Sequence, residues 1–207
     1  FHAEDGIRDV LGGLVGSEMC IRDRTSTGFD LGIDQQFAAA DTVVSATLFY
    51  NDFRNLFEYE ILDWTTFEGM MVNRDEASTS GVELAIASRP GEVFFTRLAY
   101  TYLNADNDTD DTRLIRRPRH TLDADVRYEP NEQWSIGLGL HGVADQATEG
   151  VIEPDDYFVF RAYGRMRVWE EFVVKIRVEN LFNTTYEEVP GYPALPIGVY
   201  GGIEWGF

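Results

Sequence analysis

The chain has 207 residues, of which 44% are hydrophobic and 14% aromatic, and its formal net charge is −19. This acidic excess excludes a protein that binds nucleic acid phosphates, or one held to anionic lipid by a basic patch. No run approaches the roughly 18 apolar residues of a membrane-spanning helix, but strands that cross a membrane have a much weaker hydropathy signal. The single Cys20 excludes an internal disulfide, and no Cys/His spacing indicates zinc, so we expect neither a metal nor a cofactor.

Residues 1–24 differ in pattern from everything that follows them. They show no apolar/polar alternation and lack the charged and apolar regions of a signal peptide. The run SEMCIRDR, at 17–24, resembles translated sequencing-adaptor sequence. We therefore expect residues 1–24 to be a non-native artefact without a domain, and the recognisable protein to occupy residues 25–207.

From Thr27 onward, apolar and polar residues alternate with a period of two. This period is typical of β-strands and places one set of side chains on each face of a sheet. It predicts about nine strands. They are expected at 27–37, 42–51, 80–88, 92–103, 120–128, 134–143, 157–168, 172–179 and 199–207.

The connections between these segments alternate in length. Short connections are expected at 38–41, 90–91, 130–132 and 169–171. Long connections are expected at 52–79, 104–118, 144–156 and 183–196. Short turns on one side and long loops on the other are typical of a meander that crosses an outer membrane. The fold class is therefore predicted as all-β, an antiparallel up-and-down transmembrane β-barrel.

Charge decides which face of the predicted strands meets lipid. A charge on the lipid face near the midplane costs roughly 2–4 kcal/mol, and several would exceed a typical net stability of about 5–15 kcal/mol. We therefore expect the charged face to line a wet or plugged lumen; the alternatives are a soluble sheet and a soluble lipocalin-like barrel. The predicted lumen-lining charges are Arg97, Asp123, Asp125, Arg127, Arg161, Arg165, Arg167, Lys175, Arg177 and Glu204.

A motif near the end of the chain carries a family resemblance. The stretch VENLFNTTYEEVPGYP resembles the C-terminus of TonB-dependent outer-membrane receptors, most specifically at Asn180, Leu181, Phe182, Asn183 and Tyr186. TSTGFDLGID, VNRDEASTSGVELAI and RRPRHTLDADVRY resemble other barrel strands of that family. Together these matches cover nearly everything after residue 24.

The resemblance implies a barrel of about 22 strands that is closed by an N-terminal plug. Such receptors import scarce nutrients, such as ferric siderophores or cobalamin, across the bacterial outer membrane with the help of the TonB complex. Residues 25–207 would be the C-terminal part of the barrel, without the plug. An odd count of about nine strands agrees with this, because closed bacterial barrels have even counts.

Several partners and alternatives follow from this reading. The expected partners are outer-membrane lipid, the barrel-assembly machinery, a small-molecule nutrient, and the TonB complex through the missing N-terminal part, but no nucleic acid. The alternative function is a passive porin-like barrel. An enzyme is not expected, because we find no convincing Ser/His or Asp/His pair at the outer rim.

Two further sets of residues are candidates for specific roles. The aromatic end of the last strand resembles the signal that the barrel-assembly machinery reads, namely Gly201, Ile203, Trp205 and Phe207. Aromatic loop residues bury area at low entropic cost, so they are candidates for ligand contact, although packing or interface roles are equally compatible. These are Trp64, Phe67, Tyr186 and Tyr192.

The loop at 104–118, together with the residue that follows it, contains two charged clusters. Asp106, Asp108 and Asp110 alternate as in a calcium loop, but the glycine and the distal glutamate of an EF-hand are missing, which favours a solvated loop. The basic cluster is expected to pair with the neighbouring aspartates, or else to hold lipopolysaccharide phosphates. Its members are Arg113, Arg116, Arg117 and Arg119.

Overall fold

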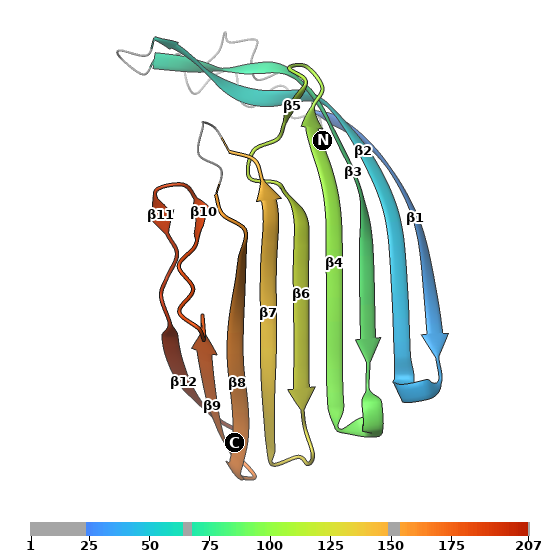
Figure 1. The fold of residues 1–207 in the computed structure, drawn as a ribbon, viewed down its shortest axis with the longest axis vertical. Helices are drawn as coiled ribbons and strands as arrows, with labels where there is room; N and C mark the ends of the chain where they lie inside the picture. The colour runs from blue at the N-terminus through green and yellow to red at the C-terminus, as the bar shows by residue number, and fades with distance from the viewer. Residues whose placement is uncertain (1–23, 64–67, 149–153, 207) are drawn as a thin grey trace, which may run out of the picture.

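The computed structural model describes residues 24–63, 68–148 and 154–206. Nine strands form one antiparallel sheet in which they are neighbours in chain order (Figure 1). They are β1 (Thr25–Phe37), β2 (Thr42–Asp63), β3 (Glu68–Ser88), β4 (Phe94–Asn107), β6 (Pro118–Tyr128), β7 (Trp134–Gln146), β8 (Tyr157–Trp169), β9 (Phe172–Glu179) and β12 (Gly198–Trp205). The predicted all-β meander is therefore confirmed.

Short elements complete the described chain. Strand β5 (Thr112–Arg113) pairs with β4, while β10 (Glu187–Val189) and β11 (Tyr192–Pro193) form a separate ribbon within the β9–β12 connection. The 3₁₀ turns η2 (Ala39–Asp41) and η3 (Pro90–Glu92) close two of the short connections. In the described ranges, no helix has the length and hydrophobicity needed to cross a membrane.

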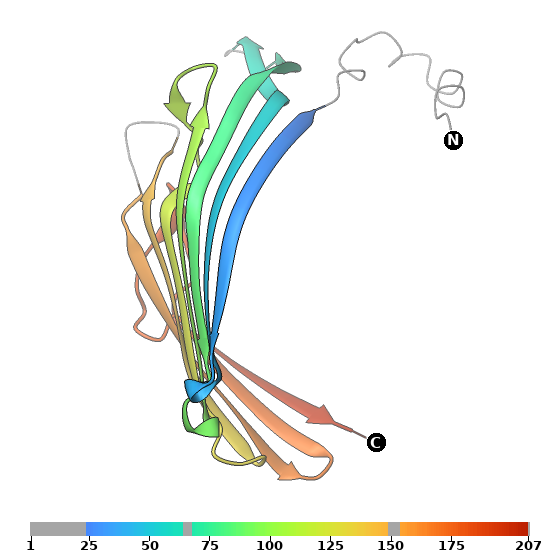
Figure 2. The same cartoon turned by 90° about the vertical axis from the view of Figure 1, so that its right-hand side faces the viewer.

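The sheet is a curved wall with two ends of different character. Figure 2 shows its curvature, with β1 and β12 at opposite edges. The short turns gather at one end of the strands and the longer connections at the other (Figure 1). The backbone N–H of Gly206 donates to the carbonyl of Glu171 over 2.9 Å, so the end of β12 lies beside the turn between β8 and β9. The 183–196 connection lies at the opposite end, as predicted.

The prediction of a long connection at 52–79 is wrong, because most of these residues belong to strands. β2 and β3 remain paired from Val43 opposite Ala87 to Asp63 opposite Glu68, with register shifts near Leu56. The physical reason is visible in the sequence FEYEILD at 57–63, where the same period of two continues past the segment that ended the prediction. The resulting hairpin extends beyond the other strands and bends away from them (Figure 1).

One face of the sheet is apolar and uncovered. Directly paired residues share a face, so the register extends this face across all nine strands. Leu31, Leu138 and Ile203 are 73%, 58% and 71% exposed there. Exposed apolar area of this extent marks an interaction surface. The described sheet therefore has no protein core on this side.

Candidate functional site on the polar face

The opposite face carries the charges. Arg97 is paired with Asp125, and Gly139 of β7 is paired with both Asp125 and Arg161, so these side chains share one face. The same register brings the other predicted charges to this face. They are Asp123, Arg127, Arg165, Arg167, Lys175, Arg177 and Glu204. That this face lines a lumen stays a prediction.

Strand β7 presents a strip of small residues to the polar face. Ser135, Gly137 and Gly139 are all buried, and side chains from the neighbouring strand β8 lie over the two glycines. A Cβ atom added to Gly139 would overlap Arg161, and one added to Gly137 would overlap the ring of Tyr163. The missing side chains on β7 therefore let two side chains of β8 reach across it to β6.

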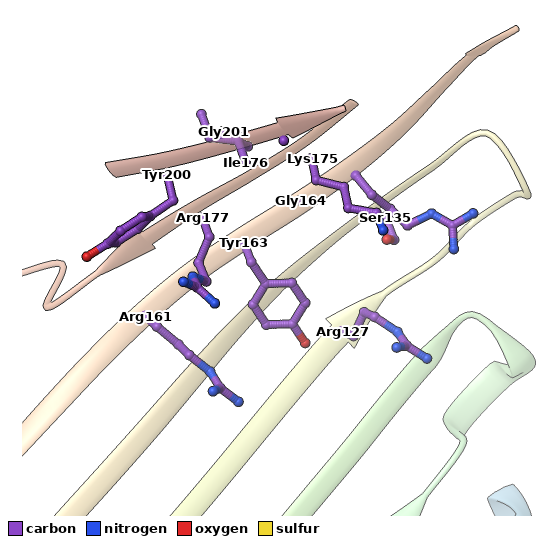
Figure 3. Close-up of a pocket in the computed structure, with 12 residues that line it drawn as sticks. Arg127, Ser135, Arg161, Tyr163, Gly164, Lys175, Ile176, Arg177, Tyr200 and Gly201 are labelled. Carbon is purple, nitrogen blue, oxygen red and sulfur yellow. The ribbon is translucent and has the colours of Figure 1, made fainter. Parts of the chain in front are cut away.

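The residue that they reach is Asp125. The hydroxyl of Tyr163 donates to Asp125 Oδ1 over 2.7 Å, and a guanidinium nitrogen of Arg161 lies 3.4 Å from Oδ2. Figure 3 shows the Arg161 and Tyr163 side chains extended in the direction of β6. These contacts connect strands β8 and β6 across β7, which stiffens the sheet at the position of Asp125.

Replacing Tyr163 by phenylalanine tests this connection. The change leaves the ring on Gly137 but removes a hydrogen bond to a carboxylate, so we expect a loss of about 1.5–3 kcal/mol in the free energy of unfolding. Urea unfolding of the folded barrel in detergent measures it. Tyr200→Phe is the matched control: its hydroxyl makes no hydrogen bond with described residues, although its ring lies beneath Arg177. Equal losses from both changes would contradict the Asp125 contact.

Two of the hollows on this face hold most of the predicted charges. The first, the outer hollow, measures about 470 Å³, and in it His141 Nδ1 lies 2.9 Å from Asp123 Oδ1. Its polar lining residues are Arg97, Asp123, Asp125, His141, Arg161, Glu179 and Tyr186. The second, the basic hollow, measures about 500 Å³ and lies over β7, β8, β9 and β12 (Figure 3). Its polar and aromatic side chains are Arg127, Ser135, Arg161, Tyr163, Arg165, Lys175, Arg177 and Tyr200.

Asn180, which begins the predicted family motif, holds the connection between β9 and β12. Its side chain is 3% exposed, and its backbone has a φ of 50°. The amide nitrogen donates to the carbonyls of Thr184 and Leu195 over 2.8 and 3.2 Å, and its oxygen accepts from the Thr184 N–H over 2.8 Å. Asparagine suits this place because it tolerates the left-handed region while it bonds nearby backbone.

The rest of the motif fastens the same connection to its neighbours. Asn183 also has a positive φ, 53°, and its side-chain oxygen accepts from the N–H of Ile197 over 3.0 Å. The Leu181 N–H donates to the carbonyl of Phe160 over 2.8 Å, and Phe182 packs edge-on against the Phe160 ring. The motif is therefore a clasp between β8, β9 and the start of β12.

The four aromatic ligand candidates fall into different surroundings. Tyr186 is half-buried and stacks on Tyr157 at a centroid distance of 4.3 Å; burial, followed by the charges of Glu188 and Glu179, raises the pKa of Tyr186. Tyr192 is 75% exposed at the rim. The structure does not bring these two together in one pocket. Trp64 and Phe67 lie outside the described residues.

The outer arginines find a partner that sequence reasoning missed. Arg113 donates to both Oδ1 and the carbonyl of Asp145 over 2.7 Å, and Arg119 donates to Asp145 Oδ2 over 3.2 Å. The expectation that these two arginines pair with the aspartates of their own loop is wrong. Asp145 belongs to β7, and only the pairing of β6 with β7 brings it beside them. The backbone φ of Asp145 is 58°, and the sequence does not signal it.

The alternating aspartates make separate contacts. Asp108 Oδ1 accepts from the Ser78 hydroxyl over 3.0 Å, and Asp106 accepts from Asn104. In the parts of the chain that the structure describes, no three His, Cys, Asp or Glu side chains are grouped so that they could hold a metal ion. These carboxylates therefore stabilise the loop through contacts with polar side chains.

The proposed assembly residues lie on the apolar face of the edge strand. Ile203 and Trp205 are 71% and 69% exposed, and a Cβ atom at Gly201 would meet nothing within 4 Å. Phe207 lies outside the described residues. Their role in assembly stays a prediction.

A comparison with models of protein families identifies the family to which this sheet belongs. The model for the family "TonB dependent receptor-like, beta-barrel" matches residues 23–181. The chain belongs to the TonB-dependent receptors. The predicted family and outer-membrane location are thereby confirmed, and so is the prediction that the protein is not an enzyme, because these receptors are transporters. A comparison with curated proteins finds no match.

Solved structures agree with the fold. The sheet is similar to Fiu, a ferric-catecholate import receptor of E. coli in its closed form, with a TM-score of 0.68 and 20% identity over 89% of this chain and 28% of that one. A structure titled copper transporter OprC gives 0.76 and 18% over 90% and 32%. The ferripyoverdine receptor of Pseudomonas aeruginosa gives 0.70 and 15% over 88% and 27%. The chain thus spans less than a third of these proteins, and the likeness shows a part of their barrel fold.

Proposed function

We propose that residues 25–207 form the C-terminal part of the barrel of a receptor for TonB-dependent active uptake of a scarce nutrient. The family match carries the proposal, and the two-faced sheet supports it. A transport wall needs one face for lipid and one for a polar interior. The solved proteins named above are titled a ferric-catecholate import receptor, a copper transporter and a ferripyoverdine receptor. A ferric siderophore or another metal complex is therefore the proposed cargo, and cobalamin is the alternative.

The proposed receptor would contact lipid through the apolar face of the sheet. Leu31, Leu138 and Ile203 belong to a face that no described element covers, and a bilayer would cover it. The edges β1 and β12 would pair with further strands of the receptor, since lipid cannot satisfy free backbone groups. The plug and the contact with TonB would belong to parts of the receptor outside this chain.

The uptake proposal is tested with the complete gene. We expect an iron-starved strain that expresses the whole receptor to accumulate a radioactive ferric siderophore, and to stop when TonB is deleted. A control strain expresses the receptor without its segment before the barrel. A passive porin would instead import without TonB and would conduct ions in a planar bilayer, and that result would overturn the proposal.

Deletion of Phe207 tests the proposed assembly signal. An aromatic end anchors a strand at the membrane interface, so we expect the intact protein without Phe207 to reach the outer membrane in several-fold lower amount. Immunoblots of outer-membrane fractions measure this. Phe207→Tyr keeps the aromatic ring and should keep the yield. A normal yield after the deletion would contradict the role.

A further inference from the structure

Two like charges face each other in the basic hollow. Arg165 of β8 and Lys175 of β9 are directly paired on the polar face. Like charges at directly opposite positions of a sheet are destabilising. Their neighbours in the same row are small, since Ser135 lies beside Arg165 on β7 and Gly202 beside Lys175 on β12. No large side chain in this row therefore separates or screens the pair.

The acidic residues nearby do not balance this pair. Glu204 lies 2.5 Å from the Lys175 ammonium and also attracts Arg165, which makes no ion pair or hydrogen bond of its own with another described residue. The other cations of the basic hollow each have a carboxylate, and none of the described residues that line it is acidic. Those pairs are Arg161 with Asp125 at 3.4 Å, Arg177 with Glu179 at 2.9 Å and Arg127 with Glu129 at 3.5 Å. Arg165 and Lys175 thus share one carboxylate, and one positive charge of the two is left over.

The row leaves space for a further group. A Cβ atom at Gly202 would meet nothing within 4 Å, so there is room above this end of the row. Tyr163 and Tyr200 are among the residues that line the basic hollow (Figure 3). A planar guanidinium beside an ammonium offers parallel donors that fit a carboxylate.

We propose that the basic hollow binds one carboxylate between Arg165 and Lys175. A single negative charge matches the single uncompensated positive charge, whereas a doubly charged phosphate would exceed it. The carboxylate belongs either to an acidic side chain of the same receptor inside the barrel or to a solute that passes this height of the wall. The inference rests on the proposed function only in that the sheet must be part of a closed barrel.

The sign of a melting shift tests the site, and this readout needs neither TonB nor uptake. The complete receptor is purified in detergent, and its melting temperature is measured in sodium chloride and in sodium acetate at equal ionic strength and pH. The variants are Arg165→Met, which keeps an apolar stem, and Arg165→Lys, which keeps the charge. Arg97→Met is the control, because Arg97 lies on the same face without an ion pair to described residues but opposite Asp125.

The two sources of the carboxylate give different results. For a side chain of the receptor, Arg165→Met should melt several degrees below the wild type and below Arg97→Met, Arg165→Lys should lose less, and acetate should have no effect. For a solute, acetate should raise the melting temperature of the wild type and of Arg97→Met but not of Arg165→Met. If Arg165→Met melts at or above the wild type in both salts, relief of repulsion dominates and the proposal is overturned. Equal losses in Arg165→Met and Arg165→Lys without an acetate effect would also overturn it, since packing alone would explain them.

Discussion

Replacing Asn180 by alanine is expected to lower the free energy of unfolding of the barrel by roughly 3 kcal/mol. The change removes three hydrogen bonds of a buried amide and leaves the N–H and carbonyl of Thr184 without their side-chain partner. Alanine also tolerates the φ of 50° less well than asparagine. Urea unfolding of the refolded receptor in detergent measures the loss, which is large against a typical stability of about 5–15 kcal/mol.

Two comparisons separate the causes of that loss. Asn180→Gly removes the side chain but relieves the backbone, so it should recover only part of the stability. Asn131→Ala is the matched control, because Asn131 also caps a connection through its side-chain oxygen, but at an exposed turn. A glycine variant as stable as the wild type would show that the left-handed backbone, and not the amide, is what position 180 requires.

Replacing Gly137 by valine is expected to cost roughly 3–5 kcal/mol. The new side chain would occupy the place of the Tyr163 ring, which would have to leave β7 and give up its hydrogen bond to Asp125. The estimate combines overpacking, about 1–3 kcal/mol, with the loss of a hydrogen bond to a charged group, about 1.5–3 kcal/mol. Urea unfolding and the heat-dependent mobility of the folded barrel in gels report the change.

The cause is isolated by a double variant and a control. In a Tyr163→Ala background the ring is gone, so Gly137→Val should cost much less than in the wild type. Gly202→Val is the matched control, because position 202 is a strand glycine on the same face with open space around it. If Gly137→Val were equally costly with and without Tyr163, the overlap with that ring would not be the reason.

The strand pattern could be predicted closely because it depends on local chemistry. A period of two appears wherever one face of a strand is apolar, so the segments at 134–143 and 157–168 agree with β7 and β8 to within a few residues. The prediction failed at 52–79 because the alternation was not followed beyond residue 51. β2 and β3 continue as a hairpin, and a paired strand outside the bilayer follows the same alternation.

That the charges share one face could also be predicted, because residues two positions apart along a strand point to the same face. Their partners could not. Asp125 contacts Tyr163 across the glycines of β7, at a sequence separation of 38 residues. Asp145 contacts Arg113 from another strand, at a separation of 32 residues. The position of a residue along its own strand does not say which side chains meet. That depends on the strand register and on the empty space that small residues leave between strands.

The sequence by itself determined the strands, their two chemically different faces and the family motif, because each depends on residues close together in the chain. Only the tertiary structure decided what the motif does and which charges remain unpaired. Asn180 and Asn183 act as a clasp because β8, β9 and β12 converge on them. Arg165 faces Lys175 because the strand register places two cations in one row. The register results from pairing along whole strands, which no single segment encodes.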